Sequence, residues 1–240
     1  MVCVYLAPMK KISLFATCCF SYLIGSSQGA DPIGSFNRYV IESWAGQYMH
    51  VGSYKVKGSP YFLGESFPGK IKYKGDDFMP ASKVLYNLLE QEAGPEAGPN
   101  QIFIADNKEL EEFMINLPEK FGGEQMHFKS GKFYGVLKTP AYYRALAEGP
   151  VVSFLRYYKV QFIADPANPL DKDFKVFDQV AEYYIFNPKA TKLDRVKLNK
   201  KDILGAMKFV PNIAAKADEW GVDFTMEAGV ISLVQKLNAQ

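Results

Sequence analysis

Cysteine and histidine are scarce in this sequence, which limits the chemistry it can carry. The 240 residues contain three cysteines, Cys3, Cys18 and Cys19, and two histidines, His50 and His127. Transition-metal sites need several cysteine, histidine or carboxylate ligands at short spacing, and a serine nucleophile needs a histidine base. The sequence therefore predicts no metal site and no cofactor, and it argues against nucleophilic catalysis.

The chain also lacks a surplus of charge and a second long apolar run. Lysine and arginine number 28, and aspartate and glutamate number 26. Proteins that bind nucleic acid or anionic membranes normally have a basic excess or a basic block, so we expect no nucleic-acid partner. Beyond the N-terminal segment no stretch reaches the roughly 18 uninterrupted apolar residues of a membrane-spanning helix. The mature chain is therefore predicted to have no transmembrane helix.

The N-terminal segment has the pattern of a secretory signal. Residues 9–11 are Met-Lys-Lys, and an apolar run follows over residues 12–24. A short basic region before such a run is typical of a signal peptide. Small residues favour cleavage between Gly29 and Ala30. We therefore expect export across the inner membrane to the periplasm or the cell surface, and association with the outer membrane stays open.

Three further expectations concern this segment. Residues 1–8 are unlike the basic region of a signal, so Met9 is the predicted start. Processing as a lipoprotein, with an acyl chain on Cys18 or Cys19, is the alternative to cleavage after Gly29. Cleavage at Gly29 removes all three cysteines and two of the 28 basic residues. The mature chain would then be free of cysteine and electrically neutral, and packing alone would stabilise it.

Apolar and polar residues alternate from about residue 39 to residue 198. In residues 70–74, Ile71 and Tyr73 would point to one face of a strand and three lysines to the other. Similar runs predict strands over residues 48–57, 101–105, 126–129, 132–138, 151–163, 180–186 and 191–198. Ser130 and Gly131 predict a two-residue hairpin turn. The Ala-Gly-Pro repeat of residues 93–100 predicts an exposed loop, because proline cannot donate to a ladder.

After residue 198 the periodicity becomes helical. Asn199 can cap one helix, Pro211 can begin a second, and a third can follow Thr225. The predicted fold is α+β, an antiparallel β-meander or curved sheet followed by two or three short C-terminal helices. The predicted organisation is a signal peptide at 1–29, an antiparallel β domain at 30–198 and a helical segment packed on it at 199–240.

Acidic residues are densest at Asp76-Asp77 and at Glu109, Glu111 and Glu112. The first pair lies in a predicted turn and the others on a polar segment, where solvated charge is the usual state. No Gly-x-Ser-x-Gly elbow and no glycine-rich phosphate loop occurs. We therefore predict that the chain is not an enzyme, and keep a hydrolase that uses a pair of carboxylates as the alternative.

Aromatic residues make up 15% of the chain, and several occur as adjacent pairs. Neighbours in a strand face opposite sides of the sheet, so either one face binds a partner through exposed rings or helices and loops cover that face. Tyr61, Phe62 and Phe67 lie in a glycine- and proline-rich stretch, residues 57–70. We expect a connector whose rings pack under or along the sheet edge, and these three residues are the candidate partner-binding residues if the stretch is a site.

Five short motifs run through most of the mature chain: GSPYFLGESFPGKIKYKG, KVLYNLLEQE, QIFIADNKELEEFMI, YYIFN and KKDILGAMK. They resemble a family of secreted proteins of about this length from Bacteroidetes-type bacteria. Two features depart from the family pattern: the Ala-Gly-Pro segment after Tyr86-Asn87, and a polar insertion at residues 164–175. The resemblance implies an exported envelope protein and transfers no catalytic residue.

These observations predict a non-enzymatic secreted or periplasmic protein of the cell envelope that binds a partner or serves as an accessory subunit. The expected partner is an envelope protein complex or an extracellular polymer. The alternatives are a hydrolase that acts on envelope polymers and a purely structural subunit.

Overall fold

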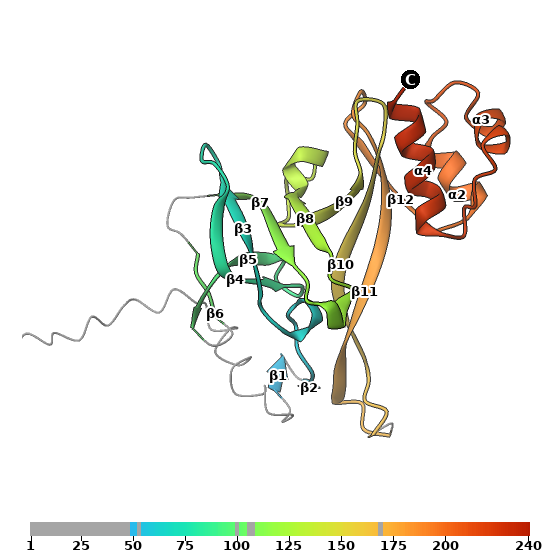
Figure 1. Cartoon of the computed structure of the whole chain (residues 1–240). Coiled ribbons are helices and arrows are strands. Elements are labelled where there is room, and N and C mark those ends of the chain that lie inside the picture. The colour runs from blue at the N-terminus through green and yellow to red at the C-terminus, as the bar shows by residue number, and fades with distance from the viewer. Residues whose placement is uncertain (1–48, 52–53, 99–100, 105–108, 168–169) are drawn as a thin grey trace, which may run out of the picture. The chain divides into compact units, whose positions relative to one another are not determined.

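The computed structural model describes residues 49–51, 54–98, 101–104, 109–167 and 170–240 (Figure 1). The predicted signal peptide, with its cleavage point at Gly29 and Ala30 and with Cys18 and Cys19, lies outside the described residues. All of the described residues belong to the unit Ile33–Gln240.

Most of the described chain belongs to one large mixed sheet. Its strands are β1 (Met49–Val51), β2 (Tyr54–Lys57), β3 (Phe67–Tyr73), β4 (Met79–Asn87), β5 (Glu92–Gly98), β6 (Gln101–Ile102), β7 (Leu110–Asn116), β8 (Gln125–Ser130), β9 (Tyr142–Ala147), β10 (Ser153–Ala164), β11 (Phe174–Asn187) and β12 (Lys192–Val196). Their order is β1-β2-β11-β10-β9-β8-β7-β3-β4-β5-β6, and β12 pairs with β11. Among the described strands every pairing is antiparallel except that of β2 with β11.

Three short α-helices follow the last strand: α2 (Lys200–Ala206), α3 (Ile213–Glu219) and α4 (Glu227–Asn238). The predicted cap of the first is confirmed, because the side chain of Asn199 accepts a hydrogen bond of 2.8 Å from the backbone N–H of Asp202. The second helix begins two residues after Pro211, behind Asn212 in the left-handed conformation. The third predicted helix is also confirmed.

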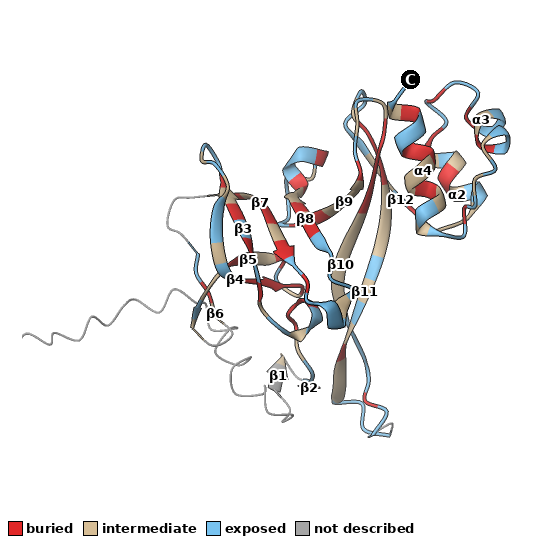
Figure 2. Cartoon of the chain, viewed as in Figure 1, coloured by how far each residue is buried: buried red, intermediate tan, exposed pale blue. Residues whose placement is uncertain are grey.

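The helices pack on one face of the sheet. Phe154, Ile185 and Val196 of the sheet and Val230 and Leu233 of α4 belong to one buried cluster. These positions alternate with residues of the opposite face, so the helices bury the apolar stripe that period-two strands present. Figure 2 shows the buried positions of α4 on the side of that helix that meets the strands.

A second buried cluster lies further along the same face and is rich in aromatic residues. Tyr86 of β4, Phe113 of β7, Phe128 of β8 and Tyr158 of β10 all contribute to it. The rings of Phe113 and Phe128 are stacked with centroids 4.7 Å apart. Strands β4 and β10 are not neighbours in the sheet, so the sheet must bend for both to reach this cluster.

The opposite face is covered near the loop that follows β8. This loop contains a 3₁₀ turn, η3 (Gly131–Tyr134). Tyr134 packs there with Tyr143, Leu155 and Phe186 in a third buried cluster. The pair Tyr142-Tyr143 is thus divided between the two faces, since Tyr142 packs against the second cluster.

The prediction of a strand at residues 132–138 is wrong, and so is the hairpin at Ser130 and Gly131. The Ser130 hydroxyl accepts a hydrogen bond from the N–H of Lys132 and so caps η3. The N–H of Gly131 donates to the carbonyl of Ala141 across the loop, at 2.7 Å. Serine favours such local bonds over a ladder, and residues 131–141 form a covering loop.

The prediction of an exposed loop at residues 93–100 is also wrong, because most of this segment is strand β5. Pro95 has no N–H, but its carbonyl accepts a hydrogen bond of 2.7 Å from the N–H of Phe103. A Cβ at Gly94 would lie 2.7 Å from the carbonyl oxygen of Phe103. Glycine therefore allows the close approach of this neighbouring segment.

Candidate functional site

The stretch at residues 57–70 contains a 3₁₀ turn, η1 (Phe62–Gly64), that is held against the edge of β11. The carboxamide of Gln179 donates to the carbonyl of Tyr61 at 2.6 Å and accepts from the N–H of Leu63 at 3.0 Å. One side chain thus makes both bonds that a neighbouring strand would otherwise make. Leu63 has a φ of 51°, and its side chain remains partly exposed beside the hydrogen bonds of Gln179.

An apolar groove of about 260 Å³ opens beside η1. We call it the η1 groove. Its lining residues come from η1, from the segment after β7 and the beginning of β8, and from β10 and β11: Phe62, Leu63, Leu117, Phe121, Met126, Tyr158, Gln179, Val180 and Ala181. Sites for drug-sized ligands usually measure about 300–1,000 Å³. The η1 groove is therefore suited to one bulky apolar group.

Tyr158 connects the η1 groove to a pair of arginines. Its ring lines the groove, and its hydroxyl accepts a hydrogen bond of 3.1 Å from Arg156. Arg144 of β9 lies directly opposite Arg156 of β10. Like charges at opposite positions destabilise a sheet, and a carboxylate neutralises each arginine. Glu124 binds Arg144 through both of its oxygens, and Glu227 of α4 pairs with Arg156.

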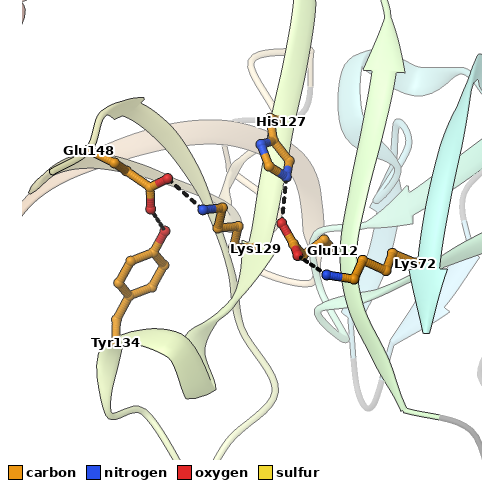
Figure 3. A network of polar contacts seen from close by, with 6 residues as sticks. All are labelled: Lys72, Glu112, His127, Lys129, Tyr134 and Glu148. Carbon is orange, nitrogen blue, oxygen red and sulfur yellow. Dashed lines mark hydrogen bonds and ion pairs between the residues drawn. The ribbon is translucent and has the colours of Figure 1, made fainter. Parts of the chain in front are cut away.

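A polar network lies on the other face of the sheet, over β3, β7 and β8 (Figure 3). The carboxylate of Glu112 accepts from Lys72 at 2.8 Å and lies 2.8 Å from Nε2 of His127. Glu112 is cross-strand partner to Lys72 on one side and to Lys129 on the other. Lys129 in turn pairs with Glu148 at 2.6 Å. Basic and acidic groups therefore alternate across the network.

Burial and charge set the protonation of this network. Burial alone would raise the pKa of Glu112, but the hydrogen bonds and charges of Lys72 and His127 outweigh burial and lower this pKa below its usual value. Burial, together with the charge of Lys129, lowers the pKa of His127, although Glu112 opposes the change. Glu112 is therefore ionised and His127 neutral near pH 7.

Glu148 also accepts a hydrogen bond of 2.6 Å from the hydroxyl of Tyr134 (Figure 3). Burial and the neighbouring charge of Glu148 raise the pKa of Tyr134 far above its usual value. The tyrosine therefore stays protonated and donates. This bond and the ion pair with Lys129 attach the η3 loop to the sheet.

The three candidate partner-binding residues are buried. Tyr61, Phe62 and Phe67 have exposed fractions of 0%, 3% and 2%. Of these, Phe62 lines the η1 groove, and it also packs on Tyr158 with ring centroids 4.9 Å apart. Partner binding by these residues stays a prediction, and Phe62 is the one placed at an opening.

The prediction of solvated charge holds for one of the acidic residues and fails for another. Asp77 lies exposed in a turn, as expected. The expectation of solvated charge is wrong for Glu112, which is 8% exposed. Its strand, β7, carries buried apolar residues at the alternate positions Phe113 and Ile115, and the side chain of Glu112 lies between Lys72 and His127.

Sequence reasoning missed Gln179 and most of the groove lining. Gln179 is polar and lies in an alternating strand, so its pattern predicts only a solvent-facing position. The lining residues come from four separate segments of the chain. The sequence holds no local signal that joins them.

Comparison with protein-family models, with curated proteins and with solved structures found no match. In the part of the chain that the structure describes, no helix combines the length and apolar character needed to cross a membrane.

Proposed function

We propose that this chain is an exported, non-enzymatic binding protein of the cell envelope, and that it captures an apolar side chain of a partner in an envelope protein complex in the η1 groove. The mixed sheet with its packed helices is the scaffold. The mature chain is free of cysteine, so this scaffold depends on packing rather than on disulfides.

The η1 groove is the observation that supports the proposal. It is lined by aromatic and aliphatic side chains, and Gln179 and the Tyr158 hydroxyl are the polar groups at its border. Both are already hydrogen-bonded within the chain. Interfaces often gain most of their binding energy from one apolar or aromatic anchor that fills such a pocket.

Pull-down of the tagged protein from its own cell envelope in mild detergent tests the proposal. Ala181 is exposed in the groove wall, opposite Tyr158, so Ala181→Trp should fill the groove. Ala190 is exposed in the turn before β12, and Ala190→Trp is the matched control. We expect the wild type and Ala190→Trp to retain one stoichiometric membrane or envelope protein, and Ala181→Trp to lose it without a change in melting temperature.

Equal capture by the two tryptophan variants would refute binding in the groove. If the wild type captures no protein, the assembly hypothesis fails, and glycans and envelope polymers become the ligands to examine.

A hydrolase is the second candidate, and the hydrogen bond between Glu112 and His127 favours it. A carboxylate that orients an imidazole is a common arrangement for a general base. Release of soluble fragments from envelope polymers by the wild type, and none by His127→Gln, would support the hydrolase and contradict the non-enzymatic proposal.

A further inference from the structure

A larger groove lies on another part of the molecule, between β12 and the helices α2 and α3. It has a volume of about 790 Å³. We call it the β12 groove. Its lining residues are Lys192, Asp194, Arg195, Val196, Lys201, Asp202, Leu204, Gly205, Ala206, Lys208, Ile213 and Ala214. None of them lines the η1 groove, so the two grooves share no lining residue.

One wall of the β12 groove is the edge of the sheet. Among the described strands β12 pairs with β11 and with no other. Alternate residues of its five-residue span therefore direct their N–H and C=O groups away from β11. Such an edge can accept an extended peptide as an added strand.

The rim of the groove is basic. Lys192, Arg195, Lys201 and Lys208 line it, against the two acids Asp194 and Asp202. Asp194 already pairs with Lys192 at 2.8 Å, and the carboxylate of Asp202 accepts from the backbone of Lys197.

Two lysines of the rim, Lys201 in α2 and Lys208 just after it, carry charges that no carboxylate of the described chain neutralises. Within the described chain, neither Lys201 nor Lys208 has a carboxylate within ion-pair distance. On β12 itself Lys192 and Arg195 pair with Asp194 and Glu182, so Lys201 and Lys208 supply the positive charge that repels a second copy of this edge. The same charges attract an acidic strand, so this edge discriminates between the two kinds of partner.

Gly205 is the second feature that points to an occupant. It lies inside α2, where glycine costs about 1 kcal/mol relative to alanine. A Cβ at this position would meet no atom within 4 Å. Packing within the chain therefore does not require the glycine, and its absent side chain leaves room in the groove for the backbone of a partner.

We infer that the β12 groove binds an extended acidic segment of a partner protein, which pairs with β12 as an additional strand. The apolar residues of that segment would contact Leu204 and Ile213, and its carboxylates would pair with the lysines at the rim. Alternation of acidic and apolar residues in the partner follows from the period of two in a strand.

The test uses fluorescence anisotropy with purified protein and a labelled peptide that alternates glutamate and valine. A peptide that alternates lysine and valine is the charge control. Two further peptides carry N-methyl groups on one or the other set of alternate amides. We expect the acidic peptide to bind, the basic peptide to bind at least about tenfold more weakly, and one of the two N-methylated peptides to lose binding.

Protein variants separate the groove from general electrostatics. The double variant Lys201→Glu, Lys208→Glu should lower the affinity at least about tenfold. Lys138→Glu has the same change of charge per residue on an exposed loop that does not line the β12 groove, and it should have less than about a twofold effect. Gly205→Gln should weaken binding because its side chain enters the groove, while thermal unfolding shows that each variant is folded.

The inference is overturned if the acidic and basic peptides bind alike, or if neither binds. It is also overturned if both N-methylated peptides bind as well as the parent, because no backbone ladder would then form. If Lys138→Glu weakened peptide binding as much as the double variant does, the loss would come from net charge and not from the β12 groove, and the inference would be wrong.

Discussion

Replacing Asn238 with alanine is expected to destabilise the protein strongly, although this residue lies two positions from the C-terminus. Its Oδ1 accepts from the N–H groups of Val151 and Val152 at 2.9 and 3.2 Å. Its Nδ2 donates to the carbonyls of Val152 and Val234 at 2.8 and 2.9 Å. The one carboxamide thus fastens the end of α4 to the beginning of β10.

The magnitude follows from the groups left without partners. Val152 is 0% exposed, so its N–H cannot turn to water, and an unsatisfied buried donor costs about 1–3 kcal/mol. Val151 is only half-buried and should contribute less. We therefore expect a loss of about 2–4 kcal/mol in the free energy of unfolding. For a chain of this size that corresponds to a fall of roughly 6–12 °C in melting temperature.

Urea unfolding followed by circular dichroism, with thermal unfolding beside it, measures this loss. Gln235→Ala on the exposed side of the same helix is the control, and it should change the free energy by less than about 0.5 kcal/mol. A loss below that value for Asn238→Ala, or one equal to that of Gln235→Ala, would refute the view that this carboxamide fastens the helix to the sheet.

Three further variants address the network and the backbone. The pKa of His127 is lowered in the folded chain, so the unfolded chain binds the proton more readily, and stability should fall as the pH drops below about 6.5. In His127→Gln the free energy of unfolding should fall less steeply between pH 6.5 and 5 than in the wild type, and an unchanged slope would contradict the assigned protonation. Gly69→Ala should abolish cooperative folding, because its Cβ would lie within 1.9 Å of the Met114 carbonyl oxygen. Gly205→Ala, which meets no atom, should instead stabilise the chain by up to about 1 kcal/mol, and similar melting curves for the two alanine variants would contradict this contrast.

The C-terminal helices could be predicted because each carries its own local signals. Asn199 caps α2, and Val230, Leu233, Val234 and Leu237 form the buried stripe of α4. These signals act within a few residues of chain. The helices could therefore be predicted without knowing which part of the sheet they contact.

Two of the wrong predictions, the loop at residues 93–100 and the strand at residues 132–138, arose where a contact with another segment or a neighbouring side chain overrides the local pattern. Residues 93–98 contain glycine and proline, which usually mark a loop, but Gly94 is needed for the approach of Phe103. Residues 132–138 alternate like a strand, yet the capping hydroxyl of Ser130 begins a 3₁₀ turn there. In both cases the deciding atom belongs to another segment or to a neighbouring side chain, which periodicity does not detect.

Both candidate grooves depend on the length of one strand. β11 has 14 residues, but β2 pairs only with Phe174–Val176 of it and β12 only with Tyr183–Asn187. Between them, residues 177–182 have β10 as their only strand neighbour in the described chain. At this gap the side chain of Gln179, rather than a paired strand, bonds the backbone of Tyr61 and Leu63 and so holds the η1 segment beside β11.

The η1 groove therefore lies where the edge of β11 has no paired strand, and the β12 groove lies beside the short strand that covers the next part of that edge. A sequence that extended β2 or β12 by a few residues would close the gap and remove the η1 groove. The unequal lengths of these strands, rather than any single motif, create both openings. The sequence shows those lengths only as interruptions in its alternation, at residues 58–66 and after residue 198, and an ordinary connector would produce the same interruptions.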